Sequence, residues 1–139
     1  MCLAWFQLLQ SFVSVNKLLN GATLQQGQEL KSPNGQFALK MQYDGNLVLY
    51  KHGRDAIWSS GTYRKGGPPY KVVMQTDNNL VLYDGWSRAL WSSGTHNGHH
   101  GLAVAILQDD GNFVVYGNHG SDGSGRNAKW STNTHHHGK

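Results

Sequence analysis

The nine residues Gln42–Tyr50 read QYDGNLVLY, and two later stretches of the chain repeat them. QTDNNLVLY occupies residues 75–83 and QDDGNFVVY occupies residues 108–116, so each copy follows the previous one after 33 residues. Internal repeats decide a fold before any local feature does. We therefore interpret the chain as three copies of one structural unit.

A tryptophan marker follows each copy. WSSGT begins at Trp58 and again at Trp91, while the related WSTNT begins at Trp130, six residues later than the period predicts. A Gly- and Ser-rich insertion at residues 117–125 accounts for the delay and is typical of a loop. We expect the three tryptophans to occupy equivalent places and to pack together in the core.

The apolar residues around the first copy alternate with polar ones. Phe37, Leu39 and Met41 share one face, and Leu47 and Leu49 share one face. Period-two alternation predicts strands, and it excludes the helical ankyrin repeat, which has a similar length. Asp-Gly or His-Gly pairs at residues 44–45, 52–53 and 84–85 stand where hairpin turns are expected. The pattern predicts three or four short antiparallel strands per repeat and a closed all-β body with pseudo-threefold symmetry.

Composition limits the function classes. The chain has 139 residues with 38% hydrophobic and 14% charged residues, which indicates one compact domain. It contains no apolar run of the roughly 18 residues that a membrane span needs. The net charge of +4 comes from scattered lysines and arginines, so nucleic-acid binding is not expected. Cys2 is the single cysteine, which excludes an internal disulfide and a multi-cysteine metal site. No catalytic constellation is visible, so we expect no enzyme.

The same alternation turns a second set of side chains outward, and this set is polar. Each copy contributes an amide, a carboxylate, a second amide, a valine and a phenol. These candidate site residues are Gln42, Asp44, Asn46, Val48, Tyr50, Gln75, Asp77, Asn79, Val81, Tyr83, Gln108, Asp110, Asn112, Val114 and Tyr116. If the chain reverses at the Asp-Gly turn, the polar side chains of one copy converge at the hairpin tip.

The chemistry of this set suits a sugar. Amides both donate and accept hydrogen bonds, an ionised Asp accepts strong ones, and sugar hydroxyls match both kinds of partner. A phosphate would be repelled by the Asp and meets no Lys or Arg in the motif. Calcium needs about six to eight oxygen ligands, which one carboxylate per site cannot supply. The sequence therefore predicts binding without a metal ion or cofactor.

A purely structural interpretation competes with this one. Asn and Asp recur at turns for backbone reasons, and a Leu-Val-Leu-Tyr strand can recur because it packs. The neighbouring positions drift between copies, for example Gly45, Asn78 and Gly111, while the five site positions do not. Three intact copies favour the binding interpretation.

Gln-x-Asp-x-Asn-x-Val-x-Tyr in three copies closely resembles the motif of the monocot mannose-binding, or bulb-type, lectin family. The resemblance covers about residues 16–134 and implies a β-prism of three four-stranded antiparallel sheets. It also implies site roles. The residues matching Asp44 and Asn46 contact the axial O2 of mannose, those matching Gln42 and Tyr50 contact O3 and O4, and Val48 packs on the ring. The resemblance implies the same roles for the corresponding residues of the second and third copies.

One family feature is missing. Many plant members have a disulfide between the first two repeats, and the matching places here are Gly45 and Tyr70. Family dimers exchange a C-terminal strand, and the long insertion before Trp130 predicts such a homodimer here. We expect a secreted protein, with the cytoplasm as the alternative because some plant members are cytosolic.

Two terminal segments complete the division of the chain. The apolar residues 1–15 are either a signal peptide or an extra strand, and residues 16–134 form the expected lectin domain. The tail, residues 135–139, contains His135, His136 and His137, and a second histidine cluster lies at His96, His99 and His100. We interpret both clusters as solvated rather than metal-binding.

The resulting hypothesis is a non-catalytic, three-site mannose lectin that recognises high-mannose glycans through avidity, with a role in defence. One rival is a structural β-prism with degenerate sugar sites, which binds proteins through an outward apolar face containing Val104 and Ile106. A second rival is a membrane-active, toxin-like relative, suggested by the apolar N-terminus.

Overall fold

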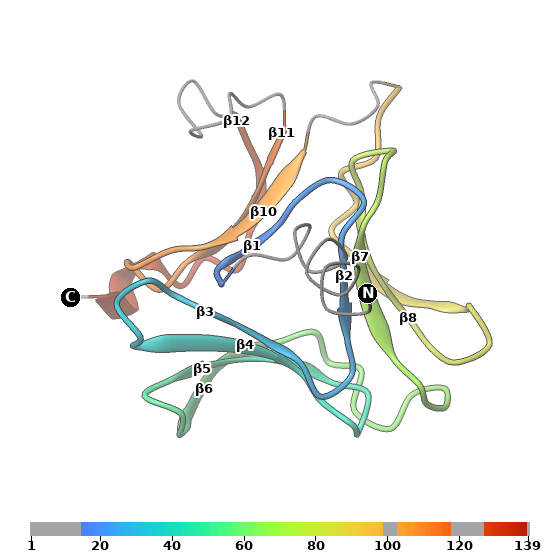
Figure 1. The fold of residues 1–139 in the computed structure, drawn as a ribbon, viewed down its shortest axis with the longest axis horizontal. Helices are drawn as coiled ribbons and strands as arrows, with labels where there is room; N and C mark the ends of the chain where they lie inside the picture. Colours follow the sequence, from blue (N-terminus) through green and yellow to red (C-terminus); the bar gives the residue numbers. More distant parts are fainter. Residues whose placement is uncertain (1–14, 99–102, 118–126, 139) are drawn as a thin grey trace, which may run out of the picture.

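A computed structural model describes residues 15–98, 103–117 and 127–138, and all further statements concern these residues. They form twelve strands and one short 3₁₀ helix, η1 (His135–Gly138). The strands make three four-stranded antiparallel sheets that stand like the walls of a prism around a common axis (Figure 1). The predicted all-β prism is confirmed.

Each repeat supplies three consecutive strands of one sheet. The first sheet has the order β3 (Glu29–Lys31), β4 (Phe37–Met41), β5 (Leu47–Lys51) and β6 (Asp55–Ser59). The second has the order β2 (Thr23–Gln25), β7 (Lys71–Met74), β8 (Leu80–Tyr83) and β9 (Ala89–Ser92). The third has the order β1 (Lys17–Leu18), β10 (Val104–Leu107), β11 (Phe113–Gly117) and β12 (Asn127–Ser131).

The fourth strand of every sheet comes from one short N-terminal stretch. β1, β2 and β3 are consecutive in the chain, yet β1 pairs with β10, β2 with β7 and β3 with β4. Each carries one leucine, and Leu18, Leu24 and Leu30 are all fully buried. This stretch ties the three repeats together, and the sequence analysis did not predict it.

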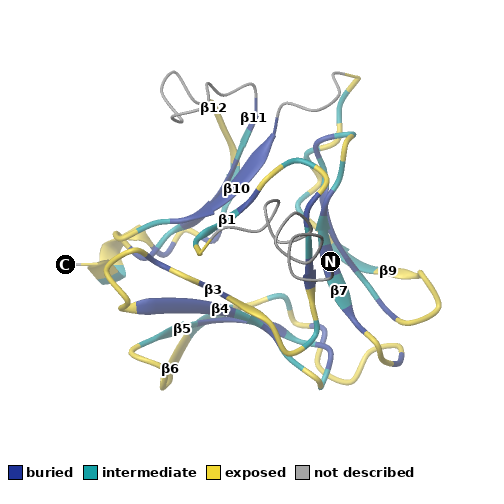
Figure 2. Ribbon diagram, in the orientation of Figure 1, coloured by how far each residue is buried: buried dark blue, intermediate teal, exposed yellow. Residues whose placement is uncertain are grey.

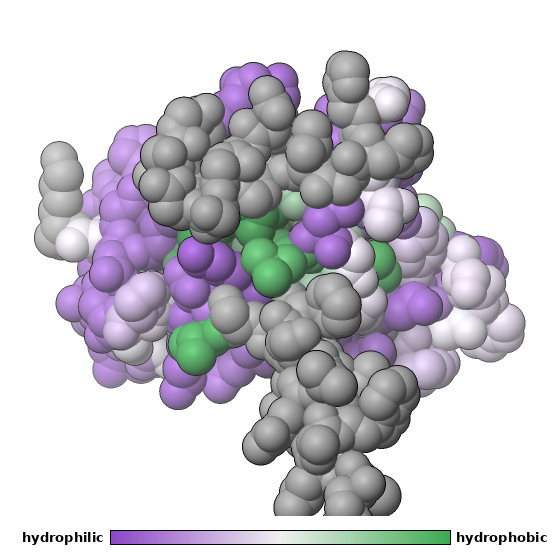
Figure 3. All heavy atoms as spheres, turned by 45° about the horizontal axis from the view of Figure 1, so that its top comes forward, coloured by the Kyte–Doolittle hydropathy of each residue, from purple (hydrophilic) through white to green (hydrophobic). Residues whose placement is uncertain are grey.

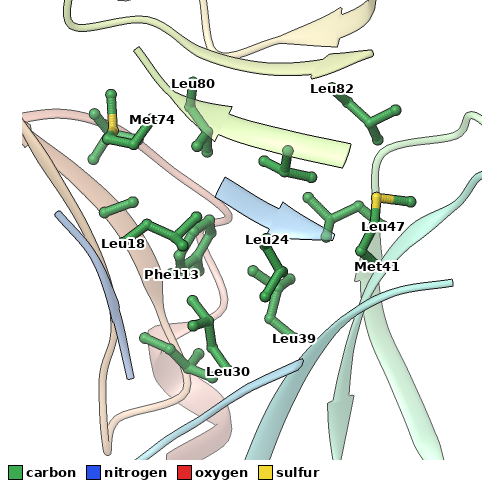
Figure 4. Packing of buried hydrophobic residues seen from close by; sticks show 14 of the residues in the cluster. Leu18, Leu24, Leu30, Leu39, Met41, Leu47, Met74, Leu80, Leu82 and Phe113 are labelled. Carbon is green, nitrogen blue, oxygen red and sulfur yellow. The ribbon is translucent and has the colours of Figure 1, made fainter. Parts of the chain in front are cut away.

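The inner faces of the sheets form one core. Leu39, Met41, Leu47 and Leu49 of the first sheet are fully buried and meet their counterparts from the other two sheets (Figures 2 and 4). Their complete burial confirms the predicted inward positions.

The three marker tryptophans meet edge to face. The ring centroids of Trp58, Trp91 and Trp130 lie 5.7, 5.6 and 5.2 Å apart in the three pairs. The three side chains are half-buried and pack against the core. The predicted contact is confirmed, but the three rings pack against the core and do not lie inside it as predicted. β12, which carries Trp130, pairs with β11 of its own chain.

The turn residues that differ between the three copies, Gly45, Asn78 and Gly111, each contact a residue of a neighbouring repeat. A Cβ at Gly45 would lie 2.8 Å from the ring of Tyr70, and a Cβ at Gly111 would lie 2.8 Å from the ring of Phe37. The third pair has a small residue opposite instead, because Ala103 faces Asn78 and donates its N–H to the Asn78 side chain. An aromatic side chain therefore leaves room only for glycine at the facing turn position, whereas an alanine leaves room for asparagine. At the family's disulfide position this chain has the buried Tyr70 ring packed on Gly45.

The apolar surface predicted around Val104 and Ile106 is not exposed in the structure. Val104 and Ile106 alternate with the core residues of β10 as predicted, but they are only 2% and 7% exposed. The exposed apolar face expected there is therefore absent from the described part of the chain. The predictions for residues 1–14, His99, His100 and the insertion fall outside the described residues. No described helix is long and apolar enough to cross a membrane. Figure 3 shows a largely polar surface with apolar side chains near the centre of the view.

Candidate functional site

The first hairpin tip, between β4 and β5, joins three of the predicted side chains and the backbone N–H of a fourth predicted residue in one chain of hydrogen bonds. Asp44 Oδ1 accepts the backbone N–H of Asn46 at 2.9 Å and Gln42 Nε2 at 3.1 Å, and Oδ2 accepts Gln42 Nε2 at 3.0 Å. The Tyr50 hydroxyl donates to Gln42 Oε1. Both ends of the Gln42 amide are thus oriented, and the Tyr50 oxygen retains its role as an acceptor.

Asn46 is oriented by the residues of the tryptophan marker. Its Oδ1 accepts Ser60 Oγ at 3.2 Å and the Thr62 backbone N–H at 3.1 Å. The Thr62 hydroxyl donates to the Gly45 carbonyl at 2.6 Å, which ties the marker to the hairpin tip. Because the carbonyl end of the Asn46 amide is occupied, its NH₂ end is the one presented to a ligand. The marker residues were not predicted to have this role.

The second and third tips repeat the chain of bonds. In the second, Gln75 Nε2 and the Asn79 N–H donate to Asp77 Oδ1 at 3.1 and 3.0 Å, and the Tyr83 hydroxyl donates to Gln75. In the third, Gln108 Nε2 and the Asn112 N–H donate to Asp110 Oδ1 at 3.2 and 2.9 Å, and the Tyr116 hydroxyl donates to Gln108. The structure therefore brings Gln, Asp, Asn and Tyr together in each of the three copies.

The clamp on the asparagine recurs as well. Asn79 Oδ1 accepts Ser93 Oγ and the Thr95 N–H at 3.2 and 3.1 Å. Asn112 Oδ1 accepts Thr132 Oγ1 and the Thr134 N–H at the same two distances, although the insertion moves these residues along the chain. Three asparagines thus present the same amide end. The signal that could have identified the clamp is its fixed spacing from the asparagine in the first two copies.

The valines lie on the predicted face but are nearly covered. Val48, Val81 and Val114 are 4%, 3% and 2% exposed, so each forms the floor of its site rather than a projecting contact. Their cross-strand neighbours differ, since Lys40 pairs with Val48, Val73 with Val81 and Ile106 with Val114. The three sites consequently share the valine and the polar side chains but differ in the residue beside the valine on the neighbouring strand.

The first site has an open flank. A hollow of about 240 Å³ lies beside it, and its lining includes Gln28, Glu29, Lys40, Gln42 and Tyr43. The Lys40 ammonium lies 5.6 Å from the centroid of the Tyr50 ring and 3.8 Å from the Glu29 carboxylate. The carboxylate and the lysine therefore meet at the edge of the site.

The three tips share one chemical character. An amide NH₂ donates, a carboxylate accepts and a phenol oxygen accepts, all above an apolar floor. Among the described residues, no group of three or more His, Cys, Asp or Glu is placed to hold a metal ion. Groups of this kind bind a ligand whose hydroxyls donate and accept at once, as those of a sugar do.

The comparisons with known proteins agree with this geometry. No family model and no curated protein matches the chain, but solved structures do. Monomeric monocot mannose-binding lectins from Gastrodia elata share 38% identity, with a TM-score of 0.72 over 86% of this chain and 97% of theirs. This chain belongs to the monocot mannose-binding, bulb-type lectin family.

Two further solved structures support the assignment of this lectin to the family. The snowdrop (Galanthus nivalis) mannose-specific agglutinin, solved with methyl-α-D-mannoside, is 39% identical, with a TM-score of 0.66 over 73% of this lectin and 89% of the agglutinin. The Japanese Marasmius oreades lectin is 30% identical, with a TM-score of 0.75 over 89% and 95% of the two chains. The lectin is accordingly a carbohydrate-binding protein and not an enzyme.

Proposed function

We propose that the lectin binds mannose at three sites, one on each sheet, without a metal ion. The observation that carries the proposal is the threefold recurrence of one oriented set of groups. In the first site these are the Asn46 NH₂, the Asp44 carboxylate and the Tyr50 oxygen.

The set favours mannose over its epimers. A hydroxyl that lies between an amide NH₂ and a carboxylate can accept from the first and donate to the second. In the family-based hypothesis this hydroxyl is the axial O2 of mannose, and glucose places its O2 equatorially. A sugar that fails to satisfy these groups leaves them unpaired, at a cost of about 1–3 kcal/mol. The snowdrop agglutinin, described as mannose-specific, supports this choice.

Avidity makes such shallow sites effective. A Kd near 1 mM, or about −4 kcal/mol, is the expected strength of one open site for one sugar. The sites are carried by three different sheets, so one branched glycan or a dense surface can engage more than one of them. Linked binding of this kind raises affinity by roughly 10² to 10⁴. The proposed targets are high-mannose glycans, and the proposed role is defence by a secreted protein.

Retention on immobilised mannan in EDTA tests the proposal. We expect retention and elution by methyl-α-mannoside but not by methyl-galactoside. Asp44→Asn, Asp77→Asn and Asp110→Asn should each weaken retention, and the triple variant should not be retained. Equal elution by the galactoside, or loss of retention in EDTA, would contradict the proposal.

The homodimer through exchange of β12 stays a prediction. β12 pairs within its own chain here, and the Gastrodia elata lectins are described as monomeric. Sedimentation velocity at micromolar concentration tests it: a dimer that dissociates on deletion of residues 127–139 supports exchange, and a monomer of the full chain refutes it.

A further inference from the structure

Five exposed residues on two adjoining loops form a surface that the sugar sites do not use. Tyr63, Arg64 and Lys65 lie between β6 and β7, and Trp86 and Arg88 lie in the β8–β9 hairpin. We call these five residues the Trp86 patch. Trp86 is 67% exposed and Tyr63 is 54% exposed, and the Arg88 side chain is 65% exposed. Large aromatic side chains beside several cations on an exposed surface are typical of a recognition surface.

The patch is held in place by a buried carboxylate. Asp84, 2% exposed, accepts the backbone N–H groups of Trp86 and Arg88 at 2.9 Å each and the Arg88 Nε at 3.0 Å. Burial alone would raise the pKa of Asp84, but these hydrogen bonds and the Arg88 charge hold that pKa below its ordinary value. The hairpin is therefore fixed from within, and the exposed Trp86 is not a loose side chain.

Two glycines join the loops into one surface. A Cβ at Gly67 would collide with the Trp86 ring, and a Cβ at Gly66 would collide with the Asp84 carboxylate. The loop backbone thus lies directly against the indole, with Lys65 next in the chain. The indole has a fixed place and a large exposed area at this junction.

Two cations of the patch, Arg64 and Arg88, lie over its aromatic rings. The Arg88 guanidinium carbon lies 5.2 Å from the centroid of the Trp86 ring, and the Arg64 guanidinium carbon lies 5.3 Å from that of Tyr63. An indole stacks on the apolar face of a sugar ring, and guanidinium N–H groups donate paired hydrogen bonds to a carboxylate or sulfate. Arg64, Lys65 and Arg88 carry positive charges, and of these Arg88 is paired with the buried Asp84. The patch is complementary to a ligand with both a ring face and negative charge.

The patch borders the first sugar site. The Arg64 N–H donates to the backbone carbonyl of Asp44 at 2.8 Å, so the loop borders the first site. A ligand that spans from a sugar site onto the patch is itself a glycan chain.

We propose that the Trp86 patch binds acidic polysaccharides, with the indole stacking on a sugar ring and the cations pairing with its carboxylate or sulfate groups. The choice of a glycan as occupant rests on the proposed sugar binding at the neighbouring site. The patch adds a charge-dependent specificity that the three repeated sites lack.

The test uses the full chain on immobilised polygalacturonate and on the same polymer after methyl esterification, which removes the charge and keeps the sugar. We expect binding to the acid form that weakens with salt, and little binding to the ester. Trp86→Ala and the double variant Arg64→Gln/Lys65→Gln should each weaken binding about tenfold, as expected for the loss of a stacked ring or two charge contacts. Arg88 is left intact because it pairs with buried Asp84.

Arg54→Gln is the matched control, since Arg54 is a cation with an 81% exposed side chain on the β5–β6 turn. It should leave binding unchanged, and no variant should change retention on mannan. Equal binding of acid and ester, or equal loss in the control, overturns the proposal. Binding to phosphatidylserine vesicles without binding to the polyuronate also overturns it, in favour of a membrane-facing role. Mannan retention by the unmutated chain tests the proposed function separately.

Discussion

Asp44 stabilises the hairpin, and in the proposed function it also supplies an acceptor to the sugar. Its half-buried carboxylate accepts the Asn46 N–H at 2.9 Å and both contacts from Gln42. A hydrogen bond to a charged group contributes about 1.5–3 kcal/mol, and water compensates part of it at a half-exposed tip. We therefore expect Asp44→Ala to lower the free energy of unfolding by about 1.5 kcal/mol. Placement near a surface turn would by itself suggest almost no effect.

Asp44→Asn separates the two roles. The amide oxygen still accepts the Asn46 N–H, so the unfolding free energy should fall by less than about 1 kcal/mol, while mannose binding is lost with the carboxylate. Urea unfolding followed by tryptophan fluorescence gives the free energy, and a thermal scan should show a shift of roughly 5 °C for the alanine variant.

Asp55→Ala is the control for this pair. Asp55 is exposed and pairs with Arg54 at 3.5 Å, a surface contact that should contribute less than about 0.5 kcal/mol. If Asp44→Ala unfolds at the same urea concentration as Asp55→Ala, the carboxylate does not hold the hairpin.

Three further outcomes are expected. Tyr70→Ala should cost about 3 kcal/mol in urea unfolding because it empties the buried space against Gly45, and an unchanged midpoint would refute the packing role. Thr62→Val should cost about 1–2 kcal/mol, since the buried Gly45 carbonyl loses its 2.6 Å donor; a neutral result would show that another group replaces it. The lowered pKa of Asp84 predicts stability that is complete above pH about 4 and is lost as pH falls further, and Asp84→Asn should flatten this acid dependence.

The sequence predicts the repeats, the strands and the site residues because their signals are local. Alternation sorts Leu47 and Leu49 from Val48 and Tyr50 within one strand, and the shift of 33 residues identifies equivalent positions. The Asp-Gly pair then predicts the tip at which the polar side chains converge.

The N-terminal strands have no comparable signal. They span two or three residues each, too short for alternation to show. Only the six-residue spacing of Leu18, Leu24 and Leu30 marks them. Their partners lie in three different repeats, and only the closed fold brings these together.

Other features depend on residues that only the folded chain brings together. The amide end that Asn46 presents depends on Ser60 and Thr62; their fixed spacing from the asparagine is visible in the sequence, but their approach to its side chain is visible only in the fold. The drift between Gly45 and Asn78 likewise follows from the residue packed opposite, Tyr70 or Ala103.

Side-chain amide NMR of Asn46, Asn79 and Asn112 tests the central claim most directly. Their Oδ1 atoms are occupied by the three clamps, and the proposed function assigns their Nδ2 groups as donors to the sugar. Titration with methyl-α-mannoside in EDTA should shift all three NH₂ signals at millimolar concentration, and methyl-galactoside should shift none. If the mannoside leaves all three signals unmoved, or moves them only when calcium is added, the three-site, metal-independent account is wrong.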